Sequence, residues 1–164
     1  GLRYVLDTTP LPHFTWQVSP EYELPGLYAA LEAWTSSSQP FEVRIRGLGW
    51  FSGEYATVYL RVLASTSLKR LFNELFELTQ PYTAELGPFY QPENWVPHVT
   101  LASNHELSTE LQPKVSAYLE QNSYDWRFRA TTLSLLYLEE GDPAREIKRF
   151  AFGSGRIDPV DPIS

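Results

Sequence analysis

A repeated motif constrains the fold of this chain more than any other feature. The stretch "PHFTWQ" at residues 12–17 returns as "PHVTLA" at residues 97–102, with a proline before each histidine and a threonine two positions after it. The shift of 85 residues from His13 to His98 also places "FEVRIR", which begins at Phe41, on "WRFRAT", which begins at Trp126. Chance gives two of three histidines these neighbours in about one of ten thousand sequences of this composition. The chain is therefore predicted to contain two related halves.

The hydrophobic pattern predicts the same order of elements in both halves. Strand-like alternation covers 13–18, 41–46, 55–64, 96–103, 125–138 and 146–155, and helical spacing covers 24–34, 68–78 and 109–121. Ser67 is the expected cap of the second helix, Ser108 or Thr109 that of the third, and "RYVLD" at 3–7 is interpreted as a further strand.

These elements predict an α+β fold. We expect it to be bilobal, with duplicated strand-helix-strand-strand halves and antiparallel sheets about a pseudo-twofold axis and a central cleft. Residues 1–164 are expected to form a single domain. Its halves would lie at approximately 10–63 and 95–153, with exchange of elements between the lobes possible.

The two histidines are the candidate catalytic residues, His13 and His98. Side chains alternate between the two faces of a β-strand. Each histidine is therefore expected on the same strand face as its threonine, Thr15 or Thr100, with Cα atoms about 7 Å apart. Imidazole has a pKa near neutrality, so one ring can accept a proton while the other donates one. The threonine hydroxyls can bind phosphate oxygens. This pattern indicates phosphoryl transfer without a metal or cofactor.

Three other interpretations remain open. The histidines can be satisfied core residues, or the repeat can be a duplicated structural strand. A metal bound by His13 and His98 is a further alternative, although neither half supplies another His, Cys or Asp at ligand spacing. The third histidine, His105, is expected in a loop.

Composition excludes several classes of protein. The chain has no cysteine, which excludes disulfides, thiolate catalysis and a cysteine-ligated metal. The net charge of -7 argues against binding to long nucleic acid, whereas a small anionic ligand in a local basic pocket remains compatible with it. No apolar run approaches the ~18 residues of a membrane span. We expect a soluble, cytoplasmic monomer without a membrane partner, and we interpret the start at Gly1 in a chain without methionine as trimmed.

The motifs resemble those of a known family. The paired "PHxT" motifs, "FEVRIRGLGWF", "ATVYLRV" and "WVPHVTLA" together resemble the 2H phosphoesterase superfamily, in particular its LigT-like branch of 2'-5' RNA ligases and cyclic phosphodiesterases. The resemblance implies a bilobal α+β fold and metal-independent chemistry on 2',3'-cyclic or 2',5'-linked phosphodiesters. It assigns His13 and His98 as the acid and base pair and Thr15 and Thr100 as phosphate-binding residues, without deciding which histidine has which role.

The chain departs from that family at three places. Ser103 stands where LigT-like members often carry an arginine after the second motif, and Trp16 stands where leucine is usual. Few residues precede His13. The alternation offers other cations for a phosphate clamp on the predicted cleft face: Arg44, Arg46, Arg127 and Arg129. Equally, these can be exposed arginines that pair with Glu42 or Asp125.

Two aromatic residues in a glycine-flanked turn complete the candidates. Trp50 and Phe51 can stack on a nucleobase, or they can be buried turn anchors. The sequence thus favours a phosphodiesterase that acts on a small nucleotide or an RNA-terminal cyclic phosphate. The alternatives are a nucleotide- or RNA-end-binding module without turnover and a 2'-5' RNA ligase-type activity.

Overall fold

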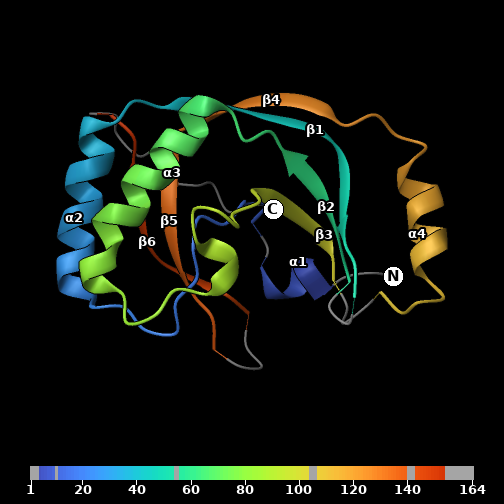
Figure 1. The fold of residues 1–164 in the computed structure, drawn as a ribbon, viewed down its shortest axis with the longest axis horizontal. Coiled ribbons are helices and arrows are strands. Elements are labelled where there is room, and N and C mark those ends of the chain that lie inside the picture. Colours follow the sequence, from blue (N-terminus) through green and yellow to red (C-terminus); the bar gives the residue numbers. More distant parts are fainter. Residues whose placement is uncertain (1–3, 10, 54–55, 104–106, 140–142, 154–164) are drawn as a thin grey trace, which may run out of the picture.

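The computed structural model describes residues 4–9, 11–53, 56–103, 107–139 and 143–153. The helices are α1 (Tyr4–Thr8), α2 (Leu24–Ser37), α3 (Thr66–Thr79) and α4 (Gln112–Leu119), with short 3₁₀ turns at Gln80–Tyr82 and Pro88–Tyr90. The strands are β1 (Phe41–Phe51), β2 (Thr57–Val62), β3 (His98–Ala102), β4 (Asp125–Ala130), β5 (Thr132–Tyr137) and β6 (Arg145–Ala151). The fold is α+β with antiparallel sheets, as the sequence predicts (Figure 1).

The strands form two antiparallel sheets. The larger sheet has the order β3-β2-β1-β4, and β5 pairs with β6 in the smaller one. In Figure 1, α2 and α3 lie on the side of β5 and β6, whereas α4 lies at the opposite end of the molecule. Strand β3, which carries the second motif, pairs with β2 from the first half of the sequence.

The register of β1 and β4 reflects the internal repeat of the sequence. Val43 lies directly opposite Phe128, and these two residues are separated by the same 85 positions as the histidines. A twofold axis between antiparallel strands places equivalent residues opposite each other at the axis. Arg44 opposite Arg127 and Glu42 opposite Arg129 fit the same relationship. The observed register is therefore the one that a pseudo-twofold axis between β1 and β4 requires.

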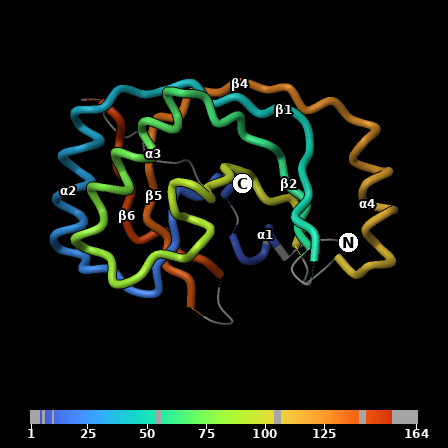
Figure 2. The backbone as a smooth tube through the Cα atoms, in the orientation of Figure 1, coloured from blue at the N-terminus to red at the C-terminus, as the bar shows by residue number. Residues whose placement is uncertain are grey.

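Strand β1 lies between β2 and β4 in the larger sheet and pairs with both of them. Phe41 to Arg46 pair with β4, Ile45 and Leu48 to Phe51 pair with β2, and the strand bends along its length (Figure 2). A bulge lies between Ile45 and Leu48, where Gly47 has φ of 73°, a conformation that glycine adopts without a steric penalty. The equivalent stretch in the second half is divided into β4 and β5. The continuous strand predicted for 125–138 is thus wrong, since the chain leaves the larger sheet at Thr131.

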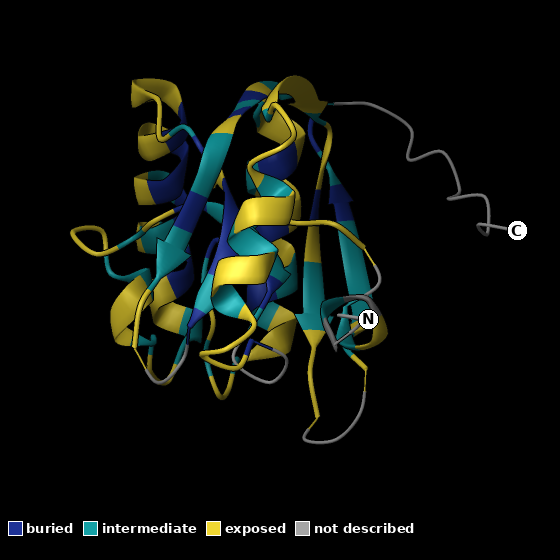
Figure 3. Ribbon diagram, turned by 90° about the vertical axis from the view of Figure 1, so that its right-hand side faces the viewer, coloured by how far each residue is buried: buried dark blue, intermediate teal, exposed yellow. Residues whose placement is uncertain are grey.

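The main core lies between α2, α3 and the inward faces of the strands. Its buried side chains come from both halves of the sequence: Trp16, Leu27, Leu31, Val43, Ile45, Leu60, Val62, Leu68, Leu71, Phe72, Leu75, Leu133, Phe150 and Phe152. In Figure 3 the helices turn exposed residues outward and buried ones towards the strands. Helix α3 begins at Thr66, before the predicted cap, because Ser65 and not Ser67 accepts the N–H of Leu68.

A second, smaller core lies under α4. Val58, Ala102 and Leu107 are buried there, and Val115 and Leu119 of α4 pack against them. Helix α4 begins at Gln112, after both predicted caps, and its preceding residue Leu111 makes no side-chain cap bond. Pro113 is accommodated in the first turn, where its missing N–H costs nothing.

Two predicted strands are absent from the described structure. Residues 13–18 have no strand assignment, and 4–8 form the short helix α1 instead of the predicted strand. The first motif is held by other contacts: the carbonyl of Thr15 accepts the indole N–H of Trp95, and the carbonyl of Val18 accepts the N–H of Gly87. These bonds occupy the backbone groups that a strand ladder would use.

Candidate functional site

Both motif histidines are oriented by the same local hydrogen bond. The Nδ1 of His13 lies 2.8 Å from the carbonyl oxygen of Leu11, and the Nδ1 of His98 lies 2.6 Å from that of Val96. A carbonyl oxygen only accepts, so each Nδ1 carries the hydrogen and donates it. In the neutral ring, Nε2 is then the acceptor. Each motif therefore presents Nε2 for proton transfer, His98 from strand β3 and His13 from a segment without a strand assignment.

His98 lies beside a pair of aromatic side chains, Phe51 and Tyr59, whose ring centroids are 4.4 Å apart. Its ring centroid lies 5.0 Å from that of Phe51, edge to face, and 5.1 Å from that of Tyr59. Burial lowers the pKa of His98, against the opposing effect of its bond to the Val96 carbonyl, and the charge of His13 lowers this pKa further. The two histidines are thus brought close enough to interact electrostatically.

Thr100 lies on the same strand as His98, whereas Thr15 and His13 lie in a segment without a strand assignment. Thr100 is two residues beyond His98 on β3 and lies opposite Tyr59 of β2. Thr15 and Thr100 are both partly buried, and neither hydroxyl has a hydrogen-bond partner among the described residues. Two hydroxyl groups are therefore available to a ligand next to the imidazoles.

An aromatic stack joins the two motifs. Trp16 of the first motif lies parallel to Trp95, with ring centroids 5.7 Å apart, and Trp95 stacks on Phe72 of α3 at 4.0 Å. The indole N–H of Trp95 donates to the carbonyl of Thr15 at 3.1 Å. Trp16, the residue that departs from the family pattern, is buried in the main core and positions the segment that carries His13.

The four predicted clamp arginines lie on the β1/β4 pair. Arg44 makes two hydrogen bonds to Asp125, at 3.0 and 2.8 Å, and Arg127 lies 3.6 Å from Glu42. The ion pairs that the sequence offered as the alternative are therefore formed. No contact of these arginines with either motif is found among the described residues, so a phosphate-clamp role for Arg44, Arg46, Arg127 or Arg129 stays a prediction.

The two candidate stacking residues lie on opposite faces of β1. Phe51 contacts the ring of His98, whereas Trp50 packs against the small core under α4. Only Phe51 is therefore at the candidate site. His105, the third histidine, lies outside the described residues.

Sequence reasoning missed two residues beside His98. Arg61 of β2 lies directly opposite His98 in the strand register, and Tyr59 contacts its ring. Alternation within "TVYLRV" places Tyr59 and Arg61 on one strand face. It does not show that β2 pairs with β3, because these strands are separated by α3 and a long loop.

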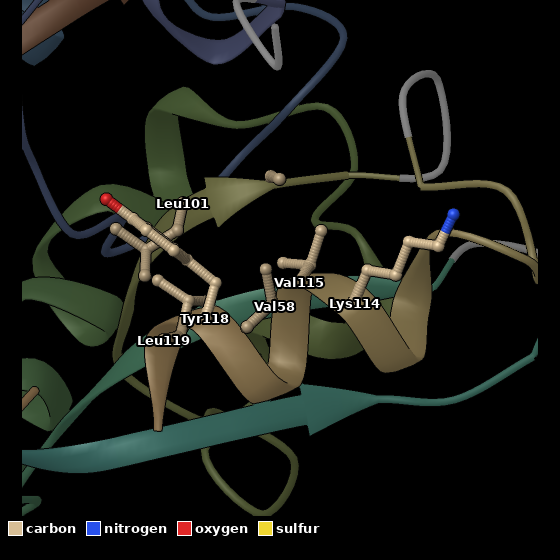
Figure 4. Close-up of a pocket in the computed structure, with 7 residues that line it drawn as sticks. Val58, Leu101, Lys114, Val115, Tyr118 and Leu119 are labelled. Atoms are coloured by element: carbon tan, nitrogen blue, oxygen red, sulfur yellow. The ribbon is translucent and has the colours of Figure 1, made fainter. Parts of the chain in front are cut away.

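The described residues contain no group of three or more His, Cys, Asp or Glu side chains suited to hold a metal. A cavity of about 260 Å³ lies elsewhere, between α4 and the strands, and is lined by apolar side chains with Lys114 and Tyr118 at its rim (Figure 4). Val58 lines it, and Val58 and Tyr59 project to opposite faces of β2. The cavity is therefore on the face of the sheet away from His98. Within the part of the chain that the structure describes, no helix is long and apolar enough to cross a membrane.

The two motif histidines have matching Nδ1 hydrogen bonds, and a threonine stands two residues after each of them on a duplicated α+β scaffold. This arrangement defines a paired-histidine phosphoesterase fold. A family model described as the 2'-5' RNA ligase superfamily matches residues 8–142. The chain belongs to this superfamily, and the resemblance to 2H phosphoesterases is confirmed.

A solved structure has a similar fold. The protein TT0787 of Thermus thermophilus aligns over 81% of this chain and 72% of its own, with 16% identity and a TM-score of 0.55. No curated protein matches the chain. Membership of the superfamily supports a 2H phosphoesterase-like or 2'-5' RNA ligase-like function.

Proposed function

We propose that the protein hydrolyses 2',3'-cyclic or 2',5'-linked nucleotide phosphodiesters between His13 and His98. The observation that carries this proposal is the matched bond from each Nδ1 to a carbonyl two residues earlier. It fixes the same tautomer in both rings and leaves both Nε2 atoms for proton transfer. Paired imidazoles in one site are suited to general acid and base catalysis on a phosphodiester.

The unequal burial of the histidines supports different roles. His98 packs against the neighbouring rings of Phe51 and Tyr59, and burial lowers its pKa, so the neutral ring predominates near pH 7. His98 is therefore the base, and the exposed His13 is the acid. Nε2 of His98 takes a proton from water, and the water oxygen attacks phosphorus. The bond from phosphorus to O3' breaks, and His13, in its imidazolium form, gives its Nε2 proton to O3', which leaves a 2'-phosphate and a neutral His13.

The threonines complete the site. Thr15 and Thr100 offer hydroxyl groups with no partner among the described residues, and they donate hydrogen bonds to the non-bridging phosphate oxygens. These oxygens hold negative charge throughout in-line attack. No step in this scheme uses a metal ion.

The expected ligand is a small nucleotide or an RNA-terminal cyclic phosphate. The net charge of -7 opposes the many phosphate contacts that long RNA requires, whereas a single phosphate needs only a local binding site. Phe51, whose ring centroid lies 5.0 Å from that of His98, is the residue that we propose to stack on the nucleobase.

The test is hydrolysis of adenosine and uridine 2',3'-cyclic phosphates with EDTA present. We expect turnover to the 2'-nucleotide, measured by chromatography, and a fall in kcat of roughly 10²–10⁴ for His13→Asn and for His98→Asn. Arg70→Gln, on the exposed face of α3, is the control with retained turnover. Undiminished turnover in both histidine variants would refute the mechanism.

One feature favours a binding module as the second candidate. Ser103 stands where an arginine is common after the second motif, and its buried Oγ has no hydrogen-bond partner among the residues that the structure describes. A module of this kind would bind a 2'-nucleotide in calorimetry and form no product. Product formation by the wild-type protein excludes it, and joining of RNA ends in the same assay would indicate ligase-type activity.

A further inference from the structure

We infer that Arg61 of β2 is the cation that binds the substrate phosphate beside His98. This inference rests on the proposed function, because it assigns a further residue to the same site. Arg61 and His98 are directly opposed in the β2/β3 register, so their Cβ atoms are about 4.5–5.5 Å apart on one face of the sheet. The candidate phosphate therefore lies within reach of the Arg61 side chain.

The face that Arg61 shares with His98 is the face of the site. Tyr59 lies two residues before Arg61 and contacts the ring of His98, and it is opposed in register to Thr100. A strand period of two keeps Tyr59 and Arg61 on the same side of β2. Strand β2 thus contributes both the Tyr59 ring that contacts His98 and the positive charge of Arg61.

Arg61 differs from the other strand arginines whose partners are known. Arg44, Arg127 and Arg149 each pair with a carboxylate, on Asp125, Glu42 and Glu146. Within the described residues, Arg61 has no such ion pair. Its charge is thus available to an anionic ligand, whereas the charges of the other three are compensated.

The resting contact of Arg61 is weak enough to be exchanged. Its Nη2 donates to the carbonyl oxygen of Leu48 at 3.1 Å, next to the bulge in β1, and the side chain is exposed. This bond uses one of the five guanidinium N–H groups, and a neutral acceptor binds about half as strongly as a phosphate oxygen. A phosphate at His98 can therefore engage the remaining donors in a two-pronged contact.

The experiment compares Arg61→Gln and Arg61→Lys with Arg70→Gln, an exposed arginine of α3 outside the site. We would measure KM and kcat for adenosine 2',3'-cyclic phosphate, the Kd of adenosine 2'-phosphate by calorimetry, and Tm. Loss of a charged two-pronged contact should raise KM and Kd by about 10–100-fold in Arg61→Gln. Arg61→Lys keeps the charge without the planar fork, so we expect a smaller rise of roughly fivefold or more.

These measurements distinguish a structural role of Arg61 from a role in binding. If Arg61→Gln lowers Tm but keeps the wild-type Kd, Arg61 only holds Leu48 and the inference is wrong. If Arg61→Gln does not fold, a wild-type Kd in Arg61→Lys is equally decisive against a two-pronged contact. A wild-type protein that neither binds nor hydrolyses the nucleotides overturns the proposed function instead.

Discussion

The indole N–H of Trp95 donates to the carbonyl oxygen of Thr15 at 3.1 Å, which joins the loop before the second motif to the middle of the first. The bond is reinforced by the parallel stack of Trp95 on Trp16. Two segments that are 80 residues apart in the sequence are thereby held together through one side chain. The relative position of His13 and His98 depends on this link, because the described first motif has no strand ladder to hold it.

Replacement of Trp95 by phenylalanine should test this link. The variant keeps an aromatic ring for the stack and removes the donor to Thr15, so the free energy of unfolding should fall by about 1 kcal/mol. We expect kcat to fall more than this change in stability suggests, because the first motif loses its fixed position. Urea denaturation and steady-state kinetics measure the two effects. Trp126→Phe, in the exposed strand β4, is the matched control and should change neither.

Replacement of Trp16 by leucine, the residue usual in the family, should destabilise this chain. Trp16 lies against Trp34, Phe41 and Phe72 as well as Trp95, and leucine leaves part of that volume empty. The expected loss is about 2 kcal/mol in the free energy of unfolding. Thermal and urea denaturation check it. Unchanged stability in Trp16→Leu would mean that the core repacks around the smaller side chain.

Much of the fold follows from local pattern, and the site follows from the repeat. Helices α2 and α3 and strands β1, β2 and β3 have the periodicities that the sequence shows, since each buries one face. The first motif has the same alternation but no strand, because the Trp95 side chain and the backbone of Gly87 bind its carbonyl groups. A pattern of polar and apolar residues does not specify which groups form hydrogen bonds with the backbone N–H and C=O.

The arginine beside His98 could not be identified from the sequence, which is a second limit of sequence reasoning. The alternation of side chains along β1 suggested Arg44 and Arg46 as clamp residues, and the alternation along β4 suggested Arg127 and Arg129. Alternation alone does not identify the neighbouring strand. The pairing of β2 with β3 joins elements across α3, and it places Arg61 opposite His98. Information on long-range register is carried by the whole core and not by any short stretch.

Gly49 should be intolerant of a side chain because of Tyr59. These residues are opposed in the β1/β2 register, and a Cβ at Gly49 would collide with the Tyr59 ring. Gly49→Ala therefore moves the ring that packs on His98, at an expected cost of about 1–3 kcal/mol and with a lower kcat. Denaturation and kinetics measure both. In Gly87→Ala the new Cβ lies 3.3 Å from the Tyr90 ring, so a much smaller effect is expected. Equal effects in the two variants would contradict the role of Tyr59.

Acidification should reduce both activity and stability through His98. Burial lowers the pKa of His98 below its ordinary value of 6.5, so the unfolded chain binds a proton at a pH where the folded protein does not. The contribution of neutral His98 to stability is thus fully present above about pH 6.5 and is lost as the pH falls through the folded pKa. For a base, the acidic limb of kcat/KM should accordingly lie below 6.5.

The contact between Phe51 and His98 gives this pH dependence a direct test. Phe51→Ala exposes the ring of His98 to water, so the pKa should rise towards 6.5 and the acidic limb should move to higher pH. NMR titration of the His98 ring protons reports the pKa, and the pH profile of kcat/KM reports the limb. His98→Asn should lose less stability than the wild type between about pH 8 and about pH 5, because it lacks the titrating group. A pKa that stays unchanged in Phe51→Ala would show that contacts other than Phe51 exclude water from His98.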